Sequence, residues 1–225
     1  MLSVIASGLS LGNMILSSAL IIFAFSLFLY FAAYNPRDSV ARSFSALLAF
    51  LAIIYVGDVF LQRLGIDAVS DFADAVVWLK FKWLGIAFIP ATYLHLSDSL
   101  LRSTNAYSRR RRLAVVMGYL ASSLFLILVA FTNLVVRDGF FFRQAVQFTA
   151  GPLFPVFAIY FIALTIWGIY NIRKARNRCL TSATRRRMTY LGLALFAPAL
   201  GVFPYLVVTN VSDELALVFA LLIYI

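Results

Sequence analysis

Long apolar stretches separated by short polar segments dominate the pattern of this chain. Six of them run roughly over Leu9–Tyr34, Phe44–Gln62, Trp78–Leu101, Leu113–Val136, Gly151–Ile172 and Met188–Val208. Each is close to the ~20 apolar residues that a helix needs to cross the hydrocarbon core of a bilayer. A seventh begins at Glu214 and reaches Ile225, so we expect that helix to continue beyond this sequence. The pattern predicts an all-α, polytopic membrane protein, in which residues 1–225 form a single seven-helix transmembrane domain.

The composition agrees with a membrane protein. Hydrophobic residues make up 63% of the chain and charged residues 12%, whereas soluble domains carry about 25% charged residues. So few charges cannot cover a surface that faces water, so the chain belongs in a bilayer. No Lys or Arg precedes Arg37, and the first apolar stretch is too long for a signal peptide, so we interpret it as a retained span.

The basic residues are unevenly distributed between the loops. Fourteen of the 19 Lys and Arg residues follow the first, third and fifth stretches: Arg37, Arg42, Arg102, Arg109–Arg112, Arg173, Lys174, Arg176, Arg178 and Arg185–Arg187. Positively charged loops stay in the cytoplasm. The distribution predicts an outside N-terminus, a cytoplasmic C-terminus and a multi-pass protein of the cell's inner (plasma) membrane. We therefore interpret the net charge of +10 as a topology signal that attracts membrane lipids, and we expect no nucleic acid partner.

The two longer loops on the opposite side differ in character. Residues 66–75 carry three aspartates, at positions 67, 71 and 74. The segment after the fourth stretch contains Phe140–Phe142, and we expect it to be an irregular aromatic loop.

Ionisable residues inside apolar stretches are costly and so require a reason. Asp58 lies inside the second stretch, where it contacts either a ligand, a neighbouring helix or water near the interface. Lys80 and Lys82 begin the third stretch beside Trp78. Either both lysines extend to the headgroups, or one turns inward toward Asp58 or an anionic ligand. Asp58, Trp78, Lys82 and Tyr205 are our candidates for an outer ligand pocket.

The far end of the third stretch carries the only histidine, His95, followed three residues later by Asp98. This spacing places both side chains on one helix face, so Asp98 could orient the imidazole. Pro90 lies in the middle of the same stretch and either bends the helix next to a pocket or is ordinary membrane-helix composition. Pro90, His95 and Asp98 are our candidates for coupling the two sides of the membrane.

Motifs for catalysis are missing from these 225 residues. The chain has one cysteine, Cys179, one histidine, no phosphate-binding glycine loop and no HExxH sequence. We therefore expect no catalytic residue, no metal site and no cofactor within the chain.

Three motifs carry a resemblance to a known family. They are Trp78-x4-Trp83-Leu84-Gly85-Ile86 followed by Pro90, Gly151-Pro152-Leu153-Phe154 followed by Tyr160, and Arg185-Arg186-Arg187 followed by Gly192 and Pro198. In their order and loop lengths they resemble the N-terminal seven-transmembrane sensor region of bacterial histidine kinases. The resemblance implies that the spans sense a small ligand or a membrane cue, and that helix seven leads to a cytoplasmic output domain, through which the protein forms a homodimer. The phosphorylated histidine and the ATP site would follow Ile225, and the resemblance supplies no ligand-binding residue.

Two functional hypotheses follow. The first is a sensor of a two-component signal-transduction system, whose full-length protein is a histidine kinase. The second is a structural or accessory subunit that contacts neighbouring membrane subunits and has little chain after Ile225. A small transporter fits less well, because charge inside the apolar stretches is sparse.

Overall fold

The computed structural model describes residues 2–63, 72–142, 145–179, 181–186 and 188–190. Its elements are α1 (Leu2–Tyr34), α2 (Ser39–Arg63), α3 (Phe72–Arg102), α4 (Arg109–Phe131), β1 (Val136–Phe142), β2 (Ala145–Ala150) and α5 (Phe154–Arg178). All five of these helices are long and apolar enough to cross a membrane. This confirms an all-α, polytopic character, while the seventh stretch and all but the start of the sixth lie outside the described residues.

α2 and α4 begin earlier than their apolar stretches because polar residues form their first turns. α2 starts at Ser39, not near Phe44, and the Asp38 carboxylate accepts a 3.0 Å hydrogen bond from the Val40 N–H. This is the usual way in which an N-cap side chain satisfies a free N–H of the first turn. α4 likewise includes the whole Arg109–Arg112 run. Hydropathy alone detects neither turn.

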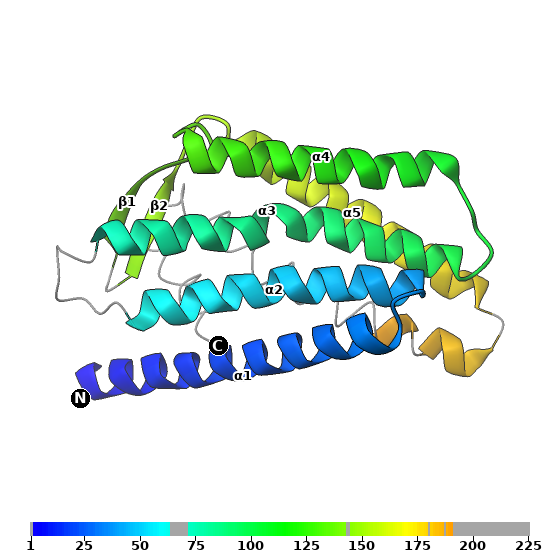
Figure 1. Cartoon of the computed structure of the whole chain (residues 1–225), viewed down its shortest axis with the longest axis horizontal. Coiled ribbons are helices and arrows are strands. Elements are labelled where there is room, and N and C mark those ends of the chain that lie inside the picture. Colours follow the sequence, from blue (N-terminus) through cyan, green and yellow to red (C-terminus); the bar gives the residue numbers. More distant parts are fainter. Residues whose placement is uncertain (1, 64–71, 143–144, 180, 187, 191–225) are drawn as a thin grey trace.

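The expected aromatic loop after the fourth stretch is a β-hairpin. β1 and β2 pair antiparallel, with a register shift between Arg137 and Gly139. The hairpin closes one end of the helix bundle (Figure 1), where Val136 and Phe148 are buried in the main hydrophobic core. The sequence pattern does not predict the hairpin because the Phe140–Phe142 run obscures the alternation of apolar and polar residues.

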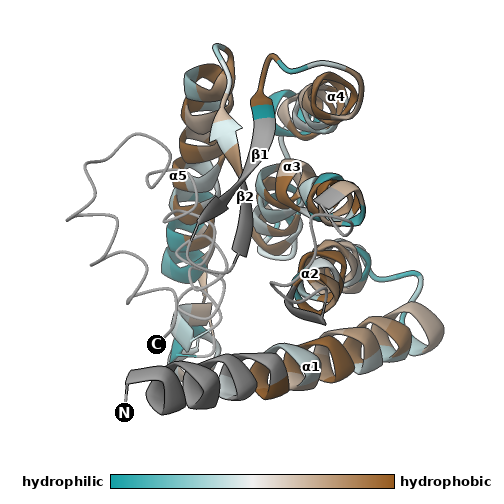
Figure 2. Cartoon of the chain, turned by 90° about the vertical axis from the view of Figure 1, so that its left-hand side faces the viewer, coloured by the Kyte–Doolittle hydropathy of each residue, from teal (hydrophilic) through white to brown (hydrophobic). Residues whose placement is uncertain are grey.

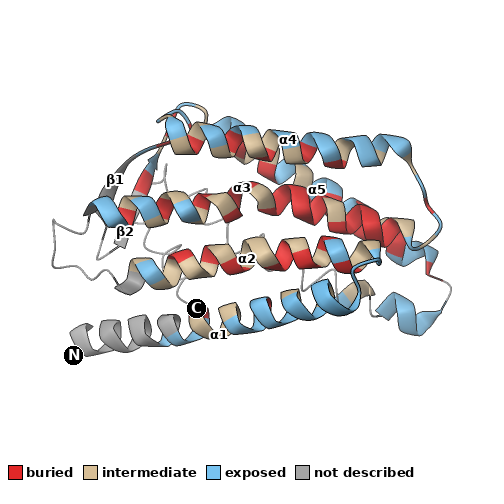
Figure 3. Cartoon of the chain, in the orientation of Figure 1, coloured by how far each residue is buried: buried red, intermediate tan, exposed pale blue. Residues whose placement is uncertain are grey.

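α3 is the central element of the described bundle. Consecutive helices run antiparallel, and α3 packs against α2, α4 and α5, while α1 contacts α2 on the outside (Figure 1). In the apolar window of α3, 56% of the residues are buried, against 11% in α1. Figure 3 shows the same contrast, with buried positions concentrated on α3. A side chain on α3 can therefore influence three neighbouring helices.

The two ends of the bundle differ in chemistry. The hairpin end contains an aromatic core around Trp83, Phe154 and Phe157. The opposite end, here called the basic end, contains the α1–α2 and α3–α4 links, the Arg109–Arg112 turn and the last turns of α5. The loops that are rich in Lys and Arg thus lie at the same end of the bundle, as their alternation along the sequence predicted.

The outward faces of the helices are apolar. Figure 2 shows hydrophobic residues around the outsides of the helices. Large exposed examples on α1, α4 and α5 are Ile22, Phe23, Leu120, Leu124, Ile159 and Ile166. Such a surface suits contact with lipid rather than with water.

Candidate functional site

An ion pair joins α2 and α3 toward the hairpin end. The Nζ atom of Lys82 lies 2.5 Å from Oδ1 of Asp58, and the two side chains are 15% and 26% exposed. The helices come close here because Gly57 has no side chain: a Cβ at that position would lie 3.0 Å from the Cβ of Lys82. Of the two sequence interpretations, Lys82 follows the inward one.

Lys80 turns toward a different helix. Its Nζ donates a 3.2 Å hydrogen bond to the carbonyl oxygen of Ala130. Ala130 lies in the last turn of α4, where backbone carbonyls have no partner within the helix. Lys82 therefore attaches α3 to α2, and Lys80 attaches α3 to α4. Both lysines thus bind a neighbouring helix, which the alternative of extension to the headgroups alone does not describe.

Trp78 belongs to an aromatic stack on the outside of the α2–α3 interface. Its ring stacks on Phe60 with a centroid distance of 4.0 Å and an angle of 3°, and Phe81 meets it edge-on. Trp78 lies one helical turn before Lys82, and Phe60 lies two residues after Asp58. The structure thus brings three of the four outer candidates to one interface, and the fourth, Tyr205, lies outside the described residues.

Pro90 lies inside α3 and is buried. A proline inside a helix frees carbonyl groups in the preceding turn because it has no N–H and crowds that turn. The carbonyl oxygen of Ala87, three residues earlier, accepts a 2.7 Å hydrogen bond from the hydroxyl of Ser122 on α4. A neighbouring helix therefore supplies a partner at the proline break.

The hydrogen-bond network at the proline break extends to α5. The hydroxyl of Tyr160 lies 2.8 Å from that of Ser122 and 2.9 Å from the carbonyl oxygen of Gly118. Each hydroxyl has one proton. Because Ser122 donates its proton to Ala87, the single proton of Tyr160 is shared between the Ser122 oxygen and the carbonyl oxygen of Gly118. One fully buried serine thus connects α3, α4 and α5.

A second charged cluster lies at the basic end. The carboxylate of Asp98, which is 1% exposed, accepts hydrogen bonds from Nε of Arg102 at 2.8 Å and from Nε of Arg111 at 2.9 Å. Arg111 also donates to the carbonyl oxygen of Ala106 in the α3–α4 link. The cluster fixes the end of α3 to the start of α4.

His95 and Asp98 share a helix face but have different partners. Nδ1 of His95 lies 3.1 Å from the hydroxyl of Tyr119 on α4, whereas Asp98 binds the two arginines. Arginine competes well for a carboxylate because a charge-assisted hydrogen bond is stronger than a neutral one. The interpretation of Asp98 as the group that orients His95 is therefore replaced by two separate α3–α4 contacts.

Two buried donors on α3 have no partner among the described residues. They are Nε1 of Trp83, which is fully buried, and the hydroxyl of Tyr93. The Tyr93 ring packs so closely on α5 that a Cβ at Gly168 would overlap it. An unpaired buried donor is costly. A hydrogen-bond acceptor that reached Nε1 of Trp83 or the hydroxyl of Tyr93 would therefore form a stabilising hydrogen bond.

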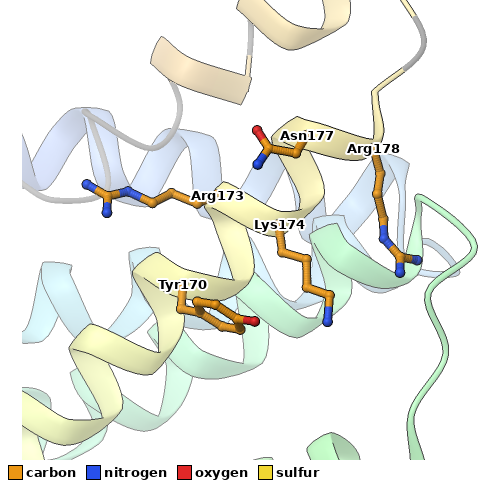
Figure 4. A pocket seen from close by; sticks show the side chains of 5 residues that line it. All are labelled: Tyr170, Arg173, Lys174, Asn177 and Arg178. Carbon is orange, nitrogen blue, oxygen red and sulfur yellow. The ribbon is translucent and has the colours of Figure 1, made fainter.

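An open hollow of about 330 Å³ lies at the basic end of α5 and is lined by Tyr170, Arg173, Lys174, Asn177 and Arg178 (Figure 4). Three of its five lining residues are cations. Within the described residues, no group of three or more His, Cys, Asp or Glu side chains could hold a metal ion.

Several of these contacts were not predicted from the sequence. Ser122 and Ser123 interrupt an apolar run, which is a signal for a polar contact, but the pattern does not say which serine faces inward. Arg111 is one of four consecutive arginines, and only its side-chain direction distinguishes it from the others.

The chain matches a known protein family. The family described as the N-terminal 7TM region of histidine kinase matches residues 14–225 of the chain. No curated protein and no solved structure matches it. The family match and the apolar helices together establish a membrane location.

Proposed function

This chain belongs to the family of N-terminal 7TM regions of histidine kinases, and we propose that it senses a cue and relays it to a cytoplasmic kinase domain. The cue is a small ligand or a membrane state, and the output is that of a bacterial two-component system. The family match over residues 14–225 carries this proposal. The sensor region contributes a conformational change, and the kinase chemistry occurs outside it.

The proposed topology has seven spans, with the N-terminus outside and the basic end in the cytoplasm of a cell with an inner (plasma) membrane. Its support is the charge at the basic end, since cytoplasmic loops carry the excess of Lys and Arg. The test uses single cysteines in a Cys179→Ser background. Asn133→Cys and Tyr107→Cys introduce thiols at exposed positions at the hairpin end and the basic end. A membrane-impermeant maleimide should label only Asn133→Cys in intact cells, and the opposite pattern would overturn the topology.

α3 is the proposed relay. Toward the hairpin end, Lys82 binds Asp58 on α2 and Lys80 binds the end of α4. In the middle, Ala87 is bonded to Ser122, and at the basic end Asp98 holds the start of α4. A cue that changes the α2–α3 interface would favour one of two arrangements of α3 relative to α4 and α5, as in other two-state switches.

Autophosphorylation of the full-length protein in membrane vesicles tests the sensor function. We expect phosphate incorporation from ATP, and a basal rate that changes at least fivefold in Asp58→Asn and in Ser122→Ala, within the usual range of coupling between sites. Ser123→Ala is the matched control, because its hydroxyl bonds only within α4.

Two results would overturn the proposal. A full-length protein that takes up no phosphate would favour the accessory-subunit hypothesis. Active variants with an unchanged basal rate, at normal membrane levels, would exclude a relay through α3.

A further inference from the structure

The outward face of α5 changes in character along the helix. Ile159, Ile162 and Ile166 are exposed on it, followed by Trp167 and Tyr170. Their spacing of three and four residues places them on one side. The opposite side, which includes Phe157, Phe161, Thr165, Gly168 and Asn171, is buried in the bundle.

The basic hollow continues this outward face. Arg173, Lys174, Asn177 and Arg178 follow Tyr170 at the same helical spacing and line the hollow together with it. In Figure 4 the Lys174 side chain extends beside Tyr170, and its Nζ lies 5.9 Å from the centre of that ring. Among the described residues, no carboxylate lines the hollow, and the acids that form ion pairs, Asp58 and Asp98, bind other cations.

The order apolar, aromatic, basic matches the layers of one membrane leaflet. Acyl chains lie next to apolar residues, Trp and Tyr occupy the interface, and Lys and Arg reach the headgroups. Seven residue steps separate Ile166 from Arg173, which is about 10 Å at the helical rise of 1.5 Å per residue. A leaflet has a hydrocarbon layer of about 15 Å, half of the bilayer core. A lipid beside α5 can therefore place its phosphate group at the cations and its acyl chain against Ile166, with Ile162 and Ile159 further along the same chain.

We propose that this face of α5 is a binding site for an anionic phospholipid. The positive charges of Arg173, Lys174 and Arg178 attract the anionic headgroup, Asn177 offers a hydrogen-bond donor to it, and one acyl chain lies along Ile159, Ile162 and Ile166. The uninterrupted apolar track distinguishes a lipid from free phosphate, which would use only the hollow. The site is independent of the output domain, so it can exist whether or not the protein is a sensor.

Quenching of tryptophan fluorescence by brominated lipids tests the proposal. The purified full-length protein is reconstituted in phosphatidylcholine vesicles that contain increasing fractions of phosphatidylglycerol with brominated chains. Trp167 is 41% exposed on the proposed face, and the part of the quenching that is lost in Trp167→Phe reports lipid at that face. We expect a relative binding constant at least fivefold higher for phosphatidylglycerol than for brominated phosphatidylcholine.

Charge-matched variants separate this site from general surface attraction. Arg173→Gln/Lys174→Gln should abolish the preference, while Arg109→Gln/Arg110→Gln, which removes two exposed cations from the same end of the bundle, should change it less than twofold. An equal loss of the preference for phosphatidylglycerol in the two double variants, or no loss in either, would overturn the proposed site. If the first pair fails to fold, the single Arg178→Gln is used instead and should lower the preference two- to threefold.

Competition distinguishes the lipid from its phosphate. Inorganic phosphate at constant ionic strength should leave the quenching by phosphatidylglycerol unchanged. Displacement of the lipid by millimolar phosphate would show that the hollow is a phosphate site without lipid specificity and would overturn the proposal.

Discussion

Ser122 of α4 donates a 2.7 Å hydrogen bond to the carbonyl oxygen of Ala87 in α3. Ala87 lies three residues before Pro90, where the helix has lost part of its internal hydrogen bonding. Tyr160 of α5 contacts the same serine hydroxyl. A change of the α3 backbone at Pro90 must therefore disturb its contact with α4 and, through Ser122, the contact between α4 and α5, so this level of the bundle acts as one unit.

Removing the Ser122 hydroxyl should loosen that unit. We expect Ser122→Ala to lower the free energy of unfolding by about 1 kcal/mol, in the range measured for hydrogen bonds between membrane helices. Equilibrium unfolding by dodecyl sulfate in mixed micelles, followed by circular dichroism, measures the change. Ser123→Ala should have a smaller effect, because that hydroxyl bonds only to Tyr119 of its own helix. Equal losses in the two variants would contradict the role assigned to Ser122.

The ion pair between Asp58 and Lys82 should appear as a coupling energy. In a double-mutant cycle with Asp58→Asn and Lys82→Gln, we expect a coupling energy of about 1 kcal/mol. The value is modest because both side chains are partly exposed, which weakens the attraction between them. Unfolding in mixed micelles again supplies the free energies. Asp58→Asn combined with Lys80→Gln should show additive effects, because Lys80 binds Ala130. Coupling as large for Lys80 as for Lys82 would disprove the assignment.

Asp98 should be the most sensitive charged residue of the described bundle. Asp98→Asn leaves Arg102 and Arg111 without their buried carboxylate, and breaking such a buried pair costs about 3 kcal/mol or more. Arg111→Gln should cost less because Arg102 remains paired. Arg112→Gln is the control, since Arg112 is exposed and should lie within about 0.5 kcal/mol of wild type. Thermal or denaturant unfolding measures these losses of stability. Any other order of the three variants would contradict the contacts assigned to Asp98.

Two glycines should respond to alanine in opposite directions. At Gly85 a Cβ would lie 2.5 Å from Cγ1 of Ile54 and 2.6 Å from the carbonyl oxygen of Phe50, so Gly85→Ala forces α2 and α3 apart. We expect a loss of about 2 kcal/mol, typical of overpacking.

At Gly118 the nearest atom would be Cδ1 of Leu164 at 3.4 Å, which is an ordinary contact. Gly118→Ala should therefore gain up to about 1 kcal/mol from helix propensity. Unfolding midpoints of the two purified variants test the pair, and a gain at Gly85 would show that the α2–α3 approach is looser than described.

The amino-acid sequence predicted less of the site than of the fold. Asp58 and Lys82 were both identified, because ionisable groups in an apolar stretch stand out. Their pairing remained one of several alternatives, since it depends on how α2 and α3 rotate toward each other. The His95–Asp98 interpretation failed for a related reason: a shared helix face did not reveal that Arg111 would reach Asp98 from α4.

By itself, the sequence determined the membrane character, the approximate limits of the first five spans and the basic end, because transfer into lipid depends on local composition and adds up residue by residue. Only the tertiary structure decided that Lys80 binds α4 while Lys82 binds α2, that Ser122 rather than Ser123 satisfies Ala87, and that residues 136–150 form a hairpin. These choices depend on the rotation and register of helices against one another. They are set by packing between residues far apart in the chain, which a local pattern of apolar and polar positions does not record.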